Sequence, residues 1–322
     1  MLESNPQGAP ESSLEAWDSW DRKGVAQFHQ PHLLFARARH ILDEELPGLT
    51  DALTSAGGVW ANALDPMTRM ISDREPRPDD DRFMAVTGRR PMIERVMAAA
   101  AEDQPGVTVR RGVRAAGLIP GHSAIPGTPG VGGVRTETGE ELRADLVVDA
   151  MGRRTPTAEW LTELGAHSPY TESEDSGFTY YSRFFTGPSH PALRGPQVTE
   201  MGTFSLLTLD GDNHTRSVTL YVSSADASLK ALRDPELFTQ VVRACPMYAH
   251  WPDGRPSPRC SRWPDHGSLP PIGWGDTSGQ PAPIRGTASR TALTALSSRT
   301  PPRSGRGLGI GLQQAWARRG MS

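Results

Sequence analysis

Cysteine is scarce in this sequence, and long apolar runs and an excess of positive charge are absent from it. Only two cysteines, Cys245 and Cys260, occur among 322 residues, which excludes a disulfide framework and a cysteine-rich metal cluster. No apolar run approaches the roughly 20 residues that cross a bilayer, so we expect no membrane span. The formal net charge is −3, and no overall basic field favours nucleic acid as a partner.

The first residues also lack the features of a secretory leader. Residues 1–21 have neither the cationic region nor the apolar region that such a leader needs. Together with the small number of cysteines, this favours a reducing, cytoplasmic location. The same residues are polar, and we expect them to form a disordered N-terminus.

Glycine and proline, in contrast, are plentiful. The chain holds 33 glycines and 29 prolines, many of them around residues 120–133 and after residue 260. Residues 261–299 combine them with serine, threonine and arginine and have almost no apolar periodicity. A segment of this composition buries too little apolar surface to offset its ordering entropy, so we expect residues 261–299 to be disordered or frame-disrupted.

The first half of the ordered region predicts an α/β arrangement. Apolar spacing predicts a helix over residues 32–46 and a second helix from Arg90 that ends at Pro105-Gly106. A continuous apolar run over residues 144–150 is typical of a fully buried strand. The remaining expectations are a strand at 107–113, a loop that includes a turn at 130–133, a hairpin turned near Thr138-Gly139, and a helix from Thr157, its N-cap, to Gly165.

The second half predicts an antiparallel sheet. Aromatic and β-branched residues predict strands over 178–187, 202–212 and 215–224, with the sequence DGDNHT as a turn between the last two. A helix, a break at Asp234-Pro235 and another helix follow. An α/β segment before an antiparallel segment predicts an α/β (α+β) protein with two domains or subdomains.

Three segments carry a resemblance to a known family. They are RKGVAQFHQPHLLFARARHIL from Arg22, then GRRPMIERVMAAAA with the later ADLVVDAMGRRTPTAEWLTELGA, and finally DNHTRSVTLYVSSADASLKALRDPELFTQVVRACPMYAHW. In this order they resemble FAD-dependent oxidoreductases, the monooxygenase-like proteins of the aromatic-hydroxylase and geranylgeranyl-reductase type, actinobacterial branch. The resemblance covers roughly residues 22–255.

The resemblance implies a domain plan. Residues 22–168 would form a partial FAD-binding domain, an incomplete FAD/NAD(P)-binding Rossmann-like fold. Residues 169–260 would form the antiparallel substrate domain with its helix. Residues 300–322 would be a remnant of the C-terminal flavin-binding motif and helix.

The resemblance also implies residues that bind FAD. A flavin dinucleotide needs cations and backbone N–H groups near its pyrophosphate and a flat wall for its ring. Gly152 lacks a Cβ and lets the chain approach a ligand closely. The implied cofactor-binding residues are Arg22, Gln27, Arg90, Gly152, Arg153, Thr155, Gly305 and Gly307.

A substrate pocket is implied beside them, with His32, Tyr181 and Phe184 in its wall. Each position also has a structural interpretation: the strand that holds Tyr181 and Phe184 suits a sheet core, and Arg153 suits a surface charge. Asp149 suits a role in orienting the turn that follows it. The residues indicate no metal site, and they identify no catalytic acid, base or nucleophile.

Departures from the family pattern lead to a further hypothesis. The opening strand, G-x-G-x-x-G loop and helix of the family is missing before Arg22, and Met151 stands where the family has an aspartate. The segment from Gly305 to Gly311 resembles a flavin-facing helix start but also suits a flexible tail. The hypothesis is a truncated member of the family.

For an intact relative, the resemblance implies a monooxygenase or hydroxylase that uses FAD, NAD(P)H and O2 on an apolar or aromatic small molecule. The alternative is a catalytically inactive remnant, or a small-molecule binding protein, that no longer binds FAD.

Overall fold

The computed structural model describes residues 1–22, 24–25, 27–62, 64, 72–73, 75–152, 155–167 and 177–257. The described chain divides into two compact units. The larger unit comprises residues 5–111 and 177–257, and the smaller unit comprises residues 2–4 and 112–167. The expectations for residues 258–322 lie outside the described residues. Within the described ranges, no helix has the length and apolar character to cross a bilayer.

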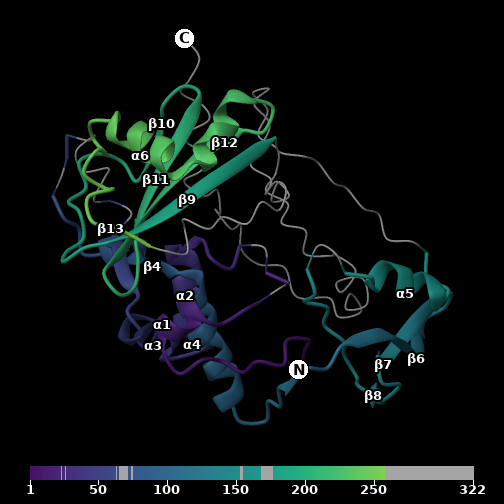
Figure 1. Ribbon diagram of the computed structural model, residues 1–322. Helices are drawn as coiled ribbons and strands as arrows, with labels where there is room; N and C mark the ends of the chain where they lie inside the picture. The colour runs from purple at the N-terminus through teal and green to yellow at the C-terminus, as the bar shows by residue number, and fades with distance from the viewer. Residues whose placement is uncertain are drawn as a thin grey trace. The chain divides into compact units, whose positions relative to one another are not determined.

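The larger unit contains a five-stranded antiparallel sheet in the order β10-β11-β12-β9-β13 (Figure 1). Its long strands match the predicted ones, and Tyr180 of β9 lies opposite Tyr221 of β12. On one face, β9, β11 and β12 pack with α6 around Phe185, Val218 and Phe238. The elements are β9 (Phe178–Thr186), β10 (Val198–Glu200), β11 (Phe204–Asp210), β12 (Thr215–Ser223), β13 (Arg255–Pro256), the 3-10 helix η2 (Ser228–Arg233) and α6 (Pro235–Arg243).

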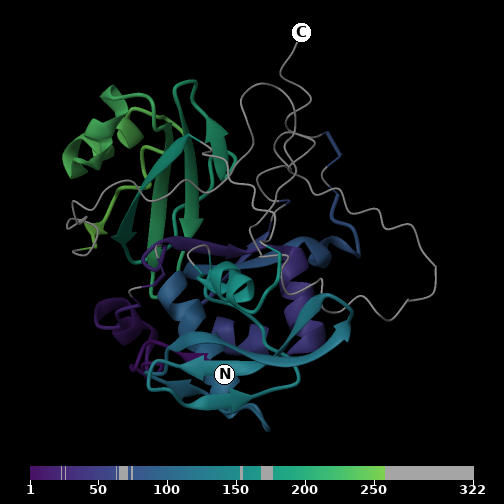
Figure 2. The ribbon, with the colours of Figure 1, turned by 90° about the vertical axis from the view of Figure 1, so that its right-hand side faces the viewer.

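The same unit contains a three-stranded antiparallel sheet in the order β2-β4-β3, with helices packed against it (Figure 2). Leu53 of α3, Val86 of β4 and Met92 of α4 form its core. The elements are α1 (Ser13–Asp18), β2 (Pro31–Leu34), α2 (Ala36–Glu45), α3 (Leu49–Ser55), β3 (Val59–Asn62), the 3-10 helix η1 (Asp80–Phe83), β4 (Met84–Arg89), α4 (Arg90–Asp103) and β5 (Arg110–Arg111).

The smaller unit is a three-stranded antiparallel sheet, β6-β7-β8, with one helix. Gly130 and Gly133 lie within β7, where a Cβ would collide with the backbone of His122 and of Leu142. These glycines therefore permit close strand packing, and the turn expected at residues 130–133 is wrong. The elements are β1 (Leu2–Glu3), β6 (Ala115–Ile125), β7 (Thr128–Thr136), β8 (Glu141–Arg143) and α5 (Thr157–Glu163).

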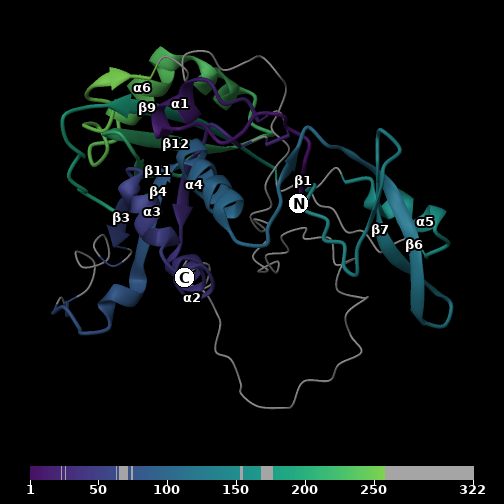
Figure 3. The ribbon, with the colours of Figure 1, turned by 90° about the horizontal axis from the view of Figure 1, so that it is seen from below.

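Three further expectations need correction. The N-terminus, expected to be disordered, forms α1, because Ser12 caps the helix and Trp17 is buried in the unit (Figure 3). The predicted helix over residues 32–46 begins later, since residues 31–34 pair with β4 as strand β2. The fully buried strand expected at 144–150 is irregular chain, in which Leu146 is 56% and Val148 71% exposed.

The physical reason for that last difference is pairing. A continuous apolar run is stable as a strand only between neighbouring strands. In the ladders that the structure describes, residues 144–150 have no strand partner.

The expectation of a mixed α and β fold with an antiparallel sheet is confirmed. The units themselves follow other boundaries than the expected division at residues 168 and 169. Residues 5–111 join residues 177–257 because β4 contacts the end of β11: Thr87 Oγ1 donates to the Asp210 carbonyl at 2.9 Å.

Candidate functional site

Polar side chains from distant parts of the chain meet in the larger unit. We name this set the arginine–tyrosine cluster; it consists of Arg22, Gln27, His32, Arg90, Glu94, Tyr180 and Tyr221. Four of these residues, Arg22, Gln27, His32 and Arg90, were implied by the family resemblance. The structure brings those four together.

Two guanidinium groups of the cluster share one carboxylate. Arg90 Nε lies 2.5 Å from Glu94 Oε1, and Arg22 Nη1 lies 3.2 Å from Glu94 Oε2. All three side chains are largely shielded from water. Because two cations meet one anion, the trio carries a net positive charge, and Arg90 stands at the N-terminal end of α4, where the helix dipole is also positive.

The junction between β4 and α4 explains how Arg90 is placed. The preceding residue, Arg89, turns to the other side and forms a buried ion pair with Asp212, in which Nη2 lies 2.7 Å from Oδ2. The Arg89 guanidinium also lies 4.5 Å from the ring centre of Trp17 in α1. Pro91 opens α4 without needing an N–H partner, and the Arg90 N–H donates to the Gln30 carbonyl at 3.2 Å.

His32 lies on β2 beside this trio. Burial is the largest cause that lowers the pKa of His32, and the charge of Arg90 lowers that pKa further, while Glu94 raises it. A histidine with a lowered pKa is neutral at neutral pH. His32 therefore adds a polar ring to the cluster without adding charge.

Two tyrosines form the part of the cluster that lies on the sheet. Gln27 Nε2 donates a hydrogen bond to the Tyr180 hydroxyl at 2.6 Å. The rings of Tyr180 and Tyr221 lie 5.8 Å apart and are tilted by 47°. Burial raises the pKa of Tyr180, and burial together with Tyr180 raises the pKa of Tyr221 to about 12, so both phenols remain protonated.

The two aromatic residues expected in the substrate pocket lie on opposite faces of β9. Tyr181 points to the opposite face from Tyr180 and packs against the core beneath α6. Phe184 is 1% exposed on the same face as Tyr180, and its ring lies 4.9 Å from that of Trp17. Their place in the wall of a substrate pocket stays a prediction.

Gly152 and Thr155 belong to the smaller unit. Gly152 has a φ of +81°, and an added Cβ would meet no atom within 4 Å, so the backbone conformation rather than close packing calls for glycine. Asp149 holds the turn, as expected: it accepts from the Met151 N–H at 2.8 Å and from the Thr155 hydroxyl at 2.6 Å. Arg153, Gly305 and Gly307 lie outside the described residues.

Sequence reasoning missed Glu94, Tyr180 and Tyr221. The sequence could have predicted the pairing of Glu94 with Arg90, because the two residues lie four positions apart on one face of the predicted helix. The tyrosine pair depends on the register between β9 and β12. That register brings residues 41 positions apart into contact, and no local pattern reports it.

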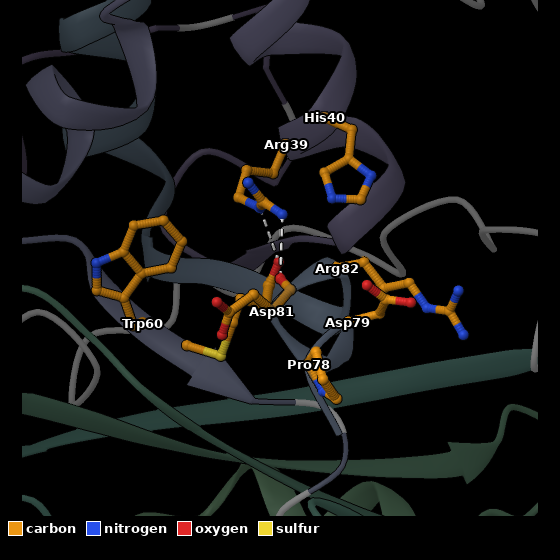
Figure 4. A pocket seen from close by; sticks show the side chains of 8 residues that line it. Arg39, His40, Trp60, Pro78, Asp79, Asp81 and Arg82 are labelled. Atoms are coloured by element: carbon orange, nitrogen blue, oxygen red, sulfur yellow. Dashed lines mark hydrogen bonds between the residues drawn. The ribbon is translucent and has the colours of Figure 1, made fainter. Parts of the chain in front are cut away.

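A hollow of about 610 Å³ lies apart from the predicted residues (Figure 4). Arg39 crosses it and is held by protein groups: its guanidinium donates to the carbonyls of Met84 at 2.9 Å and Asp81 at 3.2 Å. With that cation already engaged, the hollow offers a weaker case for an anionic ligand than the arginine–tyrosine cluster does. Its lining residues are Arg39, His40, Trp60, Pro78, Asp79, Asp81, Arg82 and Met84.

Comparison with known proteins finds a curated relative and several solved structures. No family model matches the chain. Protein Rv3254 of Mycobacterium tuberculosis is 30% identical over 190 residues, which are 52% of this chain and 37% of that protein. The chain thus spans little more than a third of the length of this relative.

The structural likeness is broader. PqsL, a probable FAD-dependent monooxygenase from Pseudomonas aeruginosa, superimposes with a TM-score of 0.51 at 12% identity, covering 80% of this chain and 64% of PqsL. A PqsL variant with four substitutions gives the same TM-score and identity over 75% of this chain and 59% of that one. The chain therefore has the fold of PqsL, which agrees with the fold that the sequence resemblance implied.

Proposed function

We propose that this chain is an FAD-dependent oxidoreductase of the monooxygenase type and that the arginine–tyrosine cluster binds FAD. One observation carries the proposal: two shielded guanidinium groups, Arg22 and Arg90, both lie against the carboxylate of Glu94. A net positive, half-buried site of this kind attracts an anionic ligand, and charge-assisted hydrogen bonds to phosphate are strong.

The chemistry of the donor set fits FAD. Arg22 and Arg90 offer positive charge to a phosphate or to an electron-rich part of the ring, and Gln27 and Tyr180 offer neutral polar contacts beside an aromatic surface. Gly152, Arg153, Thr155, Gly305 and Gly307 remain proposed contacts to the same cofactor. When bound, FAD supplies electron transfer from NAD(P)H and activation of O2.

The proposal includes the reaction class. NAD(P)H is the proposed electron donor, O2 the oxidant, and an apolar or aromatic small molecule the substrate. The first test is direct: the purified chain is mixed with FAD, passed through gel filtration, and examined for the visible flavin spectrum. Flavin absorbance that travels with the protein supports the proposal, and its complete absence favours a remnant that does not bind FAD.

Two variants test whether the cluster is the site. Arg90→Gln removes one cation, and we expect the Kd for FAD to rise about tenfold or more, since a hydrogen bond to a charged group is lost. Glu94→Gln removes the competing anion, and we expect the Kd to fall several-fold. Fluorescence titration of FAD measures both.

Arg243→Gln is the matched control, because Arg243 is an exposed arginine that pairs with the equally exposed Asp253. If wild-type protein binds FAD and folded Arg90→Gln binds it with the same Kd, the cofactor binds elsewhere on the chain.

A further inference from the structure

Gln27 and Tyr180 form a polar pair that the positive charge of the cluster does not explain. They are 153 residues apart, one in the loop after α1 and the other on β9, yet Gln27 Nε2 and Tyr180 Oη lie only 2.6 Å apart. Both side chains are half-buried. This short hydrogen bond between distant segments fixes the position of the Gln27 amide relative to the Tyr180 hydroxyl.

After their mutual hydrogen bond, Gln27 and Tyr180 still have donors and acceptors that can bind a ligand. The amide has two N–H donors and a carbonyl acceptor, and the phenol has one O–H donor and oxygen lone pairs. Their mutual bond uses one N–H and one lone pair. Among the residues that the structure describes, no other protein group bonds to the Gln27 side-chain carbonyl Oε1 or accepts the Tyr180 O–H.

The result does not depend on which way the amide is turned. If Tyr180 instead donated to the Gln27 carbonyl, the pair would still present one acceptor, the phenol oxygen, and one donor, the amide N–H. In either arrangement one donor and one acceptor stand side by side.

The surroundings keep this pair neutral and place it beside a flat surface. Burial raises the pKa of Tyr180, so its phenol keeps its proton across the physiological range. The Tyr221 ring lies next to it at 5.8 Å. A neutral donor beside a neutral acceptor, next to aromatic rings, complements a planar heterocycle whose edge carries an N–H next to a carbonyl.

We propose that Gln27 and Tyr180 bind the imide edge of the flavin ring, where the N3–H adjoins two carbonyl groups. This inference rests on the proposed function, because it concerns the same site and the same cofactor. It assigns the arginines and the polar pair to different parts of FAD: Arg22 and Arg90 supply charge, and Gln27 and Tyr180 select the ring by its hydrogen bonds.

The test compares FAD with 3-methyl-FAD, in which a methyl group replaces the N3 hydrogen and the phosphates are unchanged. We expect wild-type protein to bind 3-methyl-FAD about tenfold more weakly than FAD, the size of a lost hydrogen bond with its acceptor left unpaired. The variant that lacks the acceptor should bind the two cofactors with nearly equal affinity. That variant is Gln27→Leu if the amide carbonyl faces the ring edge, and Tyr180→Phe if the phenol oxygen does. Fluorescence titration gives the Kd values.

Tyr180→Phe supplies a second measurement. It should weaken FAD binding and shift the visible absorption bands of the bound flavin, because the hydrogen bond between the phenol and the imide edge is lost. Tyr181→Phe is the matched control, since Tyr181 is the next residue on β9 but lies on the opposite face, against the core; it should change neither the Kd nor the bands.

Each outcome decides the inference. Equal binding of FAD and 3-methyl-FAD by wild-type protein overturns it and leaves the proposed function standing. No binding of FAD at all overturns the proposed function and this inference with it. If a variant fails to fold, as thermal unfolding would show, the comparison of the two cofactors on wild-type protein still gives the answer.

Discussion

At the scale of single residues, His32 shows how burial and neighbouring charge set the protonation state of a side chain. Burial opposes a proton on His32 most strongly, and the charge of the neighbouring Arg90 opposes it as well. An ordinary histidine in the unfolded chain takes up a proton at a pKa of about 6.5, whereas folded His32 does so only at lower pH. Acidification therefore favours the unfolded chain.

This predicts a pH dependence of stability with a definite sign. The contribution of neutral His32 is fully present above about pH 6.5 and is lost as the pH falls towards the folded pKa, with a slope of at most about 1.4 kcal/mol per pH unit. We expect the free energy of unfolding to fall more steeply between pH 6.5 and 5 in wild-type protein than in His32→Gln. Urea unfolding followed by tryptophan fluorescence measures the slopes.

The control is His122→Gln, which changes an exposed histidine on β6. It should follow the wild-type slope. Parallel slopes for wild-type protein and His32→Gln would show that His32 takes up its proton alike in the folded and unfolded chain.

At the scale of elements, the β11–β12 turn anchors the start of α4. Asp212 in this turn is fully buried, accepts from the Arg89 N–H at 2.8 Å, and forms the ion pair with the Arg89 guanidinium. Asn213 and His214 follow with φ values of 54° and 56°, the left-handed conformation that a tight two-residue hairpin turn needs. The turn thereby fixes Arg89 and, next to it, Arg90 of the cluster.

Breaking this pair should be costly. Asp212→Asn leaves the buried Arg89 charge without its anion, and we expect a loss of about 3–5 kcal/mol in the free energy of unfolding. Asp253→Asn breaks the exposed pair with Arg243 and should cost less than about 1 kcal/mol. Denaturant unfolding compares them, and similar losses in both variants would contradict the anchoring role of Asp212.

A double variant separates the effect of the unpaired charge from the loss of the side-chain contact. Arg89→Met with Asp212→Asn removes both charges and keeps an oxygen acceptor for the Arg89 N–H, and it should restore much of the stability lost in Asp212→Asn alone, because no buried charge is left unpaired.

The elements also show what the sequence could predict. Strands β9, β11 and β12 and helices α4 and α6 have long, regular patterns, and the sequence predicts them well. Strands β3 and β4 were missed, because Met84–Arg89 is short and ends in charge. In the site, the resemblance supplied Arg22, Gln27, His32 and Arg90, whereas Tyr180 and Tyr221 depend on strand register, which is set by distant contacts.

At the scale of the whole molecule, the chain passes from one compact unit to the other and back. Residues 5–111 and 177–257 share the larger unit, and the intervening residues 112–167 belong to the smaller one. The sequence predicts instead two domains that follow one another, with residues 144–150 as a buried central strand of the first. The two descriptions differ most sharply at that segment.

Hydrogen exchange should decide between the two descriptions. In the described part of the chain, no backbone N–H of residues 145–150 donates a hydrogen bond, and Leu146 and Val148 are largely exposed. We expect these amides to exchange almost as fast as in an unfolded chain. The amides at the centre of β12, such as that of Val218, lie between two strands in a buried core and should exchange slower by a factor on the order of a thousand or more. If the amides of residues 145–150 were protected as strongly as those of β12, the segment would be a buried strand after all. It would then belong to a sheet that the described residues do not contain.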